Sequence, residues 1–192
     1  MEALDLHNPI HRVSVDRFHQ MIDAGVFADG DRVELIDGEM RDMSPIGPLH
    51  NSATNTLNMI LAPLLSGKAI VSVQGPLVLD DGTEVYPDLM VLRQRADRYA
   101  ESNPTGEDVL LVVEVADSSL AADTGVKLAK YAHVGIRLYW VVDIPSRALH
   151  AYRDPNAFAG RYRQLHSVGE GALGISIQGV DVRVEVADLF PR

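Results

Sequence analysis

Short apolar runs separated by polar turns follow one another along most of the chain, a pattern that indicates a strand-rich protein. Apart from Glu114, residues 109–115 are all valine or leucine. Such a run predicts a strand that is buried on both faces of a sheet. Asp37-Gly38 separates two shorter runs and is a strong hairpin-turn signal. Further strands are predicted over residues 32–36, 39–43, 69–73, 76–79, 86–92, 138–142, 148–153, 161–168 and 180–186.

Helical periodicity is confined to three segments. Ser14 is a candidate N-cap for a short first helix. Residues 50–65 predict a second helix, with Leu61 and Leu64 among its inward-facing residues, and residues 122–134 predict a third. Because helices and strands are mixed along the chain, we expect an α/β (α+β) fold. It would have a mixed central β-sheet flanked by helices, an N-terminal hairpin and a β-rich C-terminal part.

The length of 192 residues and the hydrophobic content of 46% suit one compact domain with a substantial core. We therefore expect a single domain over residues 1–192, with an N-terminal arm at 1–13, a core at about 14–153 and a β-rich extension at 154–192. No apolar run approaches the roughly 18–20 residues of a membrane-spanning helix, and the first residues do not resemble a signal peptide. We expect a cytoplasmic protein with no membrane partner.

The charge and the cysteine content exclude some kinds of site. The net charge is −10, from 17 basic and 27 acidic residues, whereas a simple nucleic-acid binder usually has a basic surface. A nuclease is still compatible with this charge, because bound metal ions and a local basic group can reverse the field in one cleft. The chain has no cysteine, so disulfides and thiolate metal sites are excluded.

Two acids stand where a carboxylate is costly. Asp88 follows a proline at the start of a predicted strand, and Glu114 interrupts the most apolar run of the chain. A buried carboxylate needs a partner, and a Mg²⁺ ion held between these two acids would supply one. Two alternatives remain: Asp88 as a turn residue that accepts hydrogen bonds from the backbone, and Glu114 as the partner of Arg137 or Arg93.

Four further residues are candidates with alternatives of their own. Lys127 could orient a water molecule or offset charge in the site, or it could form an exposed pair with Asp123, four residues earlier. Tyr131 lies on the same helical face and could contact substrate or belong to the core. Glu34 could be a third metal ligand or a solvent-facing strand residue. His50 could touch substrate or water, or it could be an ordinary residue at a helix entry.

At these residues the chain resembles the PD-(D/E)XK nuclease superfamily, and within it the Uma-two family of proposed restriction endonucleases. The resemblance covers about residues 30–153, most of the chain, with the matching pieces in the order of the family. The pieces are Glu34-Leu35-Ile36-Asp37-Gly38-Glu39, the Ser44-Pro45 loop leading to His50, Tyr86-Pro87-Asp88, Leu111-Val112-Val113-Glu114-Val115, Asp123 with Lys127 and Tyr131, and Gly135 with Tyr139-Trp140-Val141-Val142-Asp143.

The resemblance implies a restriction-endonuclease-like core with Mg²⁺ at one edge of the sheet, for which Mn²⁺ can substitute. In the superfamily, the acid after the proline and the acid on the next strand bind the metal; here these are Asp88 and Glu114. The backbone carbonyl of Val115 corresponds to a common further ligand. The superfamily's lysine usually lies two residues after the second acid, where this chain has Ala116. The resemblance places that lysine on the following helix, at Lys127.

The resemblance also assigns a role to Glu34, which corresponds to an extra acid on an early element. His50 and Tyr131 lie in the matching pieces and stay candidate contacts to substrate on the reading of the residues alone. The first hypothesis is a Mg²⁺-dependent endonuclease that acts on DNA, expected as a homodimer because cutting two strands is simplest with two active sites. A catalytically inactive nucleic-acid or protein-binding module is the alternative, favoured by Ala116 and the acidic charge. A third hypothesis changes the substrate to RNA or another phosphodiester.

Overall fold

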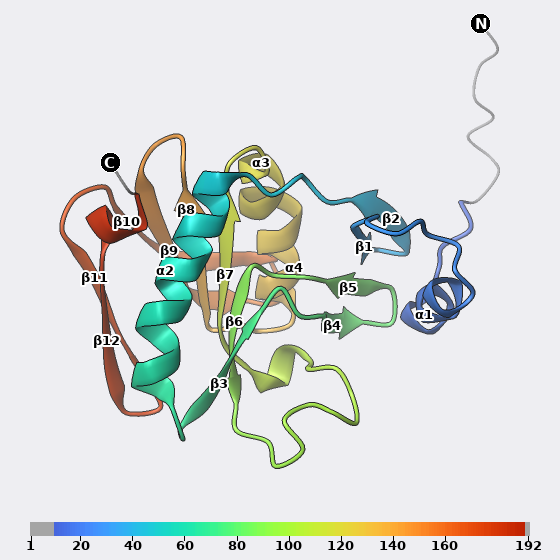
Figure 1. The fold of residues 1–192 in the computed structure, drawn as a ribbon, viewed down its shortest axis with the longest axis horizontal. Helices are drawn as coiled ribbons and strands as arrows, with labels where there is room; N and C mark the ends of the chain where they lie inside the picture. Colours follow the sequence, from blue (N-terminus) through green and yellow to red (C-terminus); the bar gives the residue numbers. More distant parts are fainter. Residues whose placement is uncertain (1–9, 191–192) are drawn as a thin grey trace, which may run out of the picture.

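The computed structural model describes residues 10–190, which form a mixed α/β fold around a six-stranded sheet (Figure 1). This agrees with the fold class that the sequence predicts. From one edge to the other, the strands of the sheet are β10 (Arg161–Val168), β9 (Ala148–Asn156), β8 (Leu138–Asp143), β7 (Val109–Ala116), β6 (Leu89–Arg93) and β3 (Ala69–Val73). The pair β7–β8 is parallel and the other neighbours are antiparallel, so the sheet is mixed.

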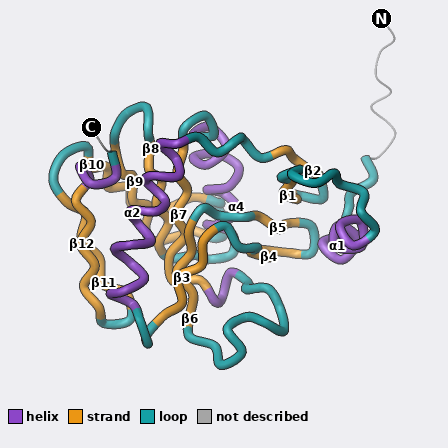
Figure 2. The backbone as a smooth tube through the Cα atoms, viewed as in Figure 1, coloured by secondary structure: helices purple, strands orange, loops and turns teal. Residues whose placement is uncertain are grey.

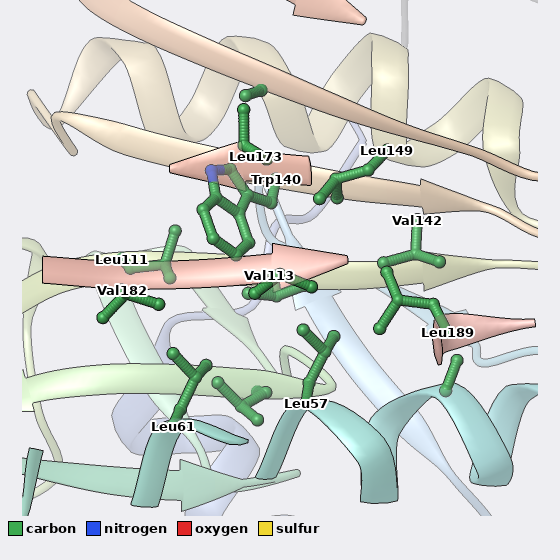
Figure 3. Packing of buried hydrophobic residues seen from close by; sticks show 14 of the residues in the cluster. Leu57, Leu61, Leu111, Val113, Trp140, Val142, Leu149, Leu173, Val182 and Leu189 are labelled. Atoms are coloured by element: carbon green, nitrogen blue, oxygen red, sulfur yellow. The ribbon is translucent and has the colours of Figure 1, made fainter. Parts of the chain in front are cut away.

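Both faces of the central strand β7 are covered, as its apolar composition predicts. Successive residues of a strand point to opposite faces. Leu111 and Val113 belong to the core cluster that contains α2 (Pro48–Leu65), whereas Val112 belongs to the cluster that contains Tyr131. Figure 3 shows the first cluster, in which Leu57 and Leu61 of α2 approach β7. Glu114 lies two residues after Val112, so its side chain points to the same face of the sheet as Val112, the face on which Tyr131 packs.

Helix α2 matches the predicted segment closely but presents a different last residue to the core. Pro48 occupies the start of the helix, where a missing N–H costs nothing. Leu57, Leu61 and Leu65 are buried at successive four-residue steps, while Leu64 is 46% exposed. The expectation that Leu64 faces inward is therefore wrong.

A smaller four-stranded sheet adjoins the central one, with helix α1 (Val15–Asp23) against it. Ser14 is the N-cap of α1 as predicted, and its side-chain oxygen accepts a hydrogen bond from the Arg17 N–H at 3.3 Å. Of the expected N-terminal arm, residues 1–9 lie outside the described residues. The strands of the smaller sheet, in order, are β2 (Glu39–Asp42), β1 (Val33–Ile36), β5 (Thr83–Val85) and β4 (Leu77–Asp80).

Strand β5 corrects one prediction that matters for the site. The strand expected over residues 86–92 begins only at Leu89, as β6, and a separate strand that was not predicted, β5, ends at Val85. Strand β5 pairs with β1 in the smaller sheet, and β6 pairs with β7 in the central one. Asp88 therefore lies in the short linker that carries the chain from one sheet to the other.

The C-terminal part is rich in strands, as predicted, and Figure 2 shows it as mostly strand. Strands β11 (Ala172–Ile177) and β12 (Val180–Glu185) form a hairpin whose apolar residues Leu173, Val182 and Val184 join the core under α2. β11 was not predicted, because Gly174 in its interior weakens the strand signal. The expected boundary at 153–154 falls inside β9, and β10 extends the central sheet. A 3₁₀ turn, Val186–Leu189, follows β12.

The segment after β7 covers the second face of the sheet. It is not the one regular helix expected over residues 122–134. After a 3₁₀ turn at Gly106–Asp108 and strand β7, the chain forms α3 (Leu120–Ala122), a π-helical turn (Asp123–Lys127) and α4 (Leu128–His133). Across residues 10–190, no helix combines the length and the apolarity needed to cross a membrane.

Candidate functional site

Four residues that are far apart in the sequence meet where the two sheets adjoin. Glu34 comes from β1, Asp88 from the linker before β6, Glu114 from β7 and Lys127 from the π-helical turn. All four are buried, with exposed fractions of 6, 7, 3 and 7% respectively. The Lys127 ammonium lies 3.1 Å from Glu34 Oε2 and 3.3 Å from Glu114 Oε1. The acids and the lysine selected from the sequence therefore form one cluster.

The π-helical turn adds one more acid to this cluster. Asp123 is 1% exposed, and its Oδ1 lies 3.8 Å from Lys127 Nζ. A π-helical turn is wider than an α-helical one and is frequent at functional sites. Here it brings Asp123, Lys127 and Tyr131 to one buried face. The alternative of an exposed Asp123–Lys127 pair is therefore wrong, because both side chains face the interior.

A tyrosine of the central sheet supports the widened turn. The hydroxyl of Tyr139, on β8, donates a hydrogen bond to the backbone carbonyl of Asp123 at 2.8 Å, and the residues are buried. Such a bond satisfies a carbonyl in a place where water does not reach. The Ser119 hydroxyl donates to Asp123 Oδ2 at 2.5 Å and orients the carboxylate.

Asp88 is held by hydrogen bonds from two other elements. Its Oδ2 accepts the Val115 N–H at 2.8 Å and lies 3.0 Å from Nε2 of His50, in the first turn of α2. Strands β6 and β7 pair with Leu89 opposite Val113, so the residue before β6 reaches the end of β7 near Glu114. Asp88 therefore accepts a hydrogen bond from the backbone, as its alternative reading predicts, and it also belongs to the cluster. The carbonyl of Val115 as a metal ligand stays a prediction.

Tyr131 is placed differently from the expectation. It is fully buried, and its hydroxyl donates to Glu114 Oε1 at 2.7 Å. The side chain lies behind Glu114 and packs against Tyr139, with 4.9 Å between the ring centroids. The expectation that Tyr131 contacts substrate is therefore corrected: its hydroxyl supports Glu114 instead. The alternative of an arginine partner for Glu114, Arg137 or Arg93, is also wrong, because the partners of Glu114 are Lys127 and Tyr131.

The electrostatics follow from several buried acids sharing one ammonium. Burial alone lowers the pKa of Lys127, but the charges of Glu114, Glu34 and Asp123 raise it above its ordinary value. Lys127 therefore stays protonated. Burial raises the pKa of Glu114 to about 8, despite the opposing effect of Lys127, and Asp123 and Asp88 add to the increase. Burial likewise raises the pKa of Asp123. The cluster therefore contains more buried acidic groups than positively charged ones.

The donor set fits a hard divalent cation. The buried oxygen Asp123 Oδ1 has no hydrogen-bond donor and lies 3.8 Å from Lys127 Nζ, while Glu34 Oε2 is 3.1 Å from the same ammonium. In the part of the chain that the structure describes, no three acidic or histidine side chains form a ready metal cage. Mg²⁺ does not need one, because it commonly keeps several waters and binds one or two carboxylates. Asp88 and Glu114 have the type and proximity for that role.

The cluster opens into a cleft of about 300 Å³. One wall is the segment between β2 and α2, which Figure 1 shows passing from the smaller sheet to the central one. His50 lines this cleft, and its contact with substrate stays a prediction. Glu34 lines the cleft too, so the solvent-facing alternative for Glu34 is wrong. Arg32 and Asp117 also line it and were not selected; single surface charges carry no sequence signal that separates them from others.

Comparisons with known proteins agree with this geometry. The Uma2 family model, described as "Putative restriction endonuclease", matches residues 15–185. A crystal structure from Anabaena variabilis, described as a putative nuclease belonging to DUF820, superposes with a TM-score of 0.69. The two sequences are 13% identical, and the match covers 95% of this chain and 98% of the other. At that identity the likeness establishes the fold alone. No curated protein sequence matches the chain.

Proposed function

The chain belongs to the Uma2 family, and on that premise we propose that it is a divalent-metal-dependent endonuclease that hydrolyses phosphodiester bonds of DNA. The observation that carries the proposal is the excess of buried carboxylates over cations in one cleft. A protein that used this cleft only for binding would gain nothing from several buried acids, whose burial is costly without a cation.

In the proposed mechanism, Asp88 and Glu114 would hold Mg²⁺, and Glu34 and the carbonyl of Val115 are the candidate further ligands. When bound, the metal would supply Lewis-acid stabilisation of charge on the phosphate. Val115 and His50 keep Asp88 in place through its Oδ2. Tyr131 keeps Glu114 in place through its Oε1.

Lys127 has the geometry and charge of an electrostatic catalyst. Because its pKa is raised by the surrounding acids, it stays an ammonium group and donates hydrogen bonds. We infer that it orients the attacking water and offsets negative charge on the scissile phosphate. Its position beside Glu114 also compensates for Ala116, since the lysine reaches the second acid from the next helical segment, 3.3 Å away.

A cleavage assay tests the proposal. Supercoiled plasmid, single-stranded DNA and structured RNA would each be incubated with Mg²⁺ or Mn²⁺ and wild-type protein, Asp88→Asn or Asp117→Asn. Asp117 is exposed and lines the same cleft, so Asp117→Asn is the matched control. We expect metal-dependent DNA cleavage by wild type and the control, and none by folded Asp88→Asn. Cleavage by Asp88→Asn at the wild-type rate would contradict the assignment, and RNA as the preferred substrate would change the substrate class.

The inactive binding module is the second candidate, favoured by the net charge of −10. It predicts folded protein without metal affinity or cleavage.

The homodimer is a further proposal, and sedimentation of the protein alone and with duplex DNA tests it. A dimer in either sample supports cutting of two strands by paired sites, while a monomer in both contradicts it.

A further inference from the structure

A second cavity, of about 430 Å³, adjoins the cleft. It lies between α1, the loop that follows α1, and β1. Arg32, Met43 and Tyr86 line both the cleft and this second cavity, so the two lie side by side at these residues. We propose that this cavity binds an unpaired nucleobase of the strand being cut, one nucleotide from the scissile phosphate. The inference rests on the proposed function, because the cleft must hold the phosphate.

Two aromatic side chains give the cavity stacking surfaces. The hydroxyl of Tyr86 donates to Glu84 Oε1 at 2.7 Å, and the fully buried Glu84 also lies 2.7 Å from Nε2 of His19. These bonds fix the orientation of the Tyr86 ring from behind. Phe27 packs edge-on against Phe18, with ring centroids 5.7 Å apart. A flat base stacks favourably on such fixed aromatic faces, whatever its identity.

The polar side chains around the cavity favour a base that carries an amino group. Gln74 lines it with a backbone φ of 51°, a left-handed conformation that is unusual for glutamine and is found at functional positions. Asp29 and Asp31 also line the cavity, and Asp31 Oδ2 accepts the Ala28 N–H at 2.8 Å. Carboxylate and amide oxygens accept hydrogen bonds from the amino groups of adenine, cytosine and guanine, which thymine lacks.

The position of the cavity determines the form of the substrate. A base inside a duplex is stacked and paired, so it enters a side cavity only when it is single-stranded or rotated out of the helix. Arg32 lies where the cleft and the cavity join, and its guanidinium suits the phosphate between the two. The acidic residues of the cavity would repel a phosphate, which leaves the base as the group that suits them.

Small probes test the inference on the full chain. We would titrate wild-type protein, in the presence of Mg²⁺, with the 3′,5′-bisphosphates of the four deoxynucleosides and with deoxyribose 3,5-bisphosphate, which has no base. Two-dimensional NMR gives each Kd, reports whether each variant is folded, and locates the contacts. The variants are Phe27→Leu, Gln74→Gly and the control Phe158→Leu, whose parent side chain is 99% exposed on the β9–β10 turn. Gln74→Gly removes the amide at a φ that suits glycine.

We expect the probes with amino-bearing bases to bind at least about 10-fold more tightly than the base-free probe. Phe27→Leu should weaken their binding roughly 5- to 100-fold and leave the base-free probe unchanged. Gln74→Gly should reduce the preference over thymidine, and Phe158→Leu should change nothing.

Equal affinity for probes with and without a base would overturn the base site while leaving the proposed function intact, since the phosphate would still bind in the cleft. The base site is also overturned, and the proposed function again left intact, if Phe27→Leu weakens every probe equally. Absence of binding by all five probes would overturn both proposals.

Discussion

Replacement of Glu114 by glutamine should make the folded protein more stable at neutral pH. Glu114 is buried beside Lys127, and its pKa of about 8 lies well above the ordinary 4.5. Between these two values the folded state binds more protons than the unfolded state, so the stability falls as the pH rises. Glutamine keeps the shape and accepts hydrogen bonds from Lys127 and Tyr131 through its carbonyl oxygen, but it does not titrate.

The size of the effect follows from the difference between the two pKa values. Each unit of that difference is worth about 1.4 kcal/mol. From pH 5 to pH 7, wild type should therefore lose about 2–3 kcal/mol of unfolding free energy through Glu114, and Glu114→Gln should not.

Urea unfolding in metal-free buffer at pH 5, 6, 7 and 8 measures this difference. We expect the unfolding free energies of wild type and Glu114→Gln to diverge as the pH rises, with the variant more stable at pH 7. Asp117→Asn, which changes an exposed acid of the same cleft, should keep the wild-type pH dependence. A Glu114→Gln variant that is less stable at every pH, with an unchanged slope, would refute the reasoning. It would mean that Glu114 is ionised and that its pair with Lys127 stabilises the fold.

Four further substitutions give definite expectations. Lys127→Met removes the cation from Glu34 and Glu114, so it should cost about 3–5 kcal/mol in unfolding free energy; thermal melts should show part of the loss restored by Mn²⁺, and an unchanged Tm would contradict this. Tyr139→Phe removes the hydroxyl that donates to the buried carbonyl of Asp123 and should lower the free energy of urea unfolding by about 1–3 kcal/mol. An unchanged free energy of unfolding would contradict this. Leu61→Ala should cost about 2–5 kcal/mol, whereas Leu64→Ala, at an exposed position, should stay within about 0.5 kcal/mol; equal costs would contradict the packing of α2.

Much of the fold could be predicted because local composition carried the information. The run around Glu114 predicted the central strand, and Asp37-Gly38 predicted the hairpin of β1 and β2. The Uma-two resemblance is confirmed by the family match over residues 15–185. Strand β5 was missed because it has only three residues, although it pairs with the neighbouring β4 as well as with β1, which lies almost fifty residues earlier in the chain.

The members of the site and their clustering could be predicted, but the details of the arrangement could not. The sequence singled out Asp88, Glu114 and Lys127, and the structure brings them together. The sequence could not show that Asp123 faces inward, because the four-residue spacing of Asp123 and Lys127 is the same on an exposed helix and on a π-helical turn. Tyr139 contacts that turn from another strand, and local periodicity does not reveal such a contact.

The most direct test of the metal site is calorimetric titration of Mn²⁺ into metal-free wild type, Asp88→Asn and Asp117→Asn. It needs no knowledge of the target sequence in DNA. The account predicts binding by wild type and Asp117→Asn, and none by Asp88→Asn, which should remain folded. Equal binding by Asp88→Asn, or no binding by any of the three, would contradict a metal site built on Asp88 and Glu114.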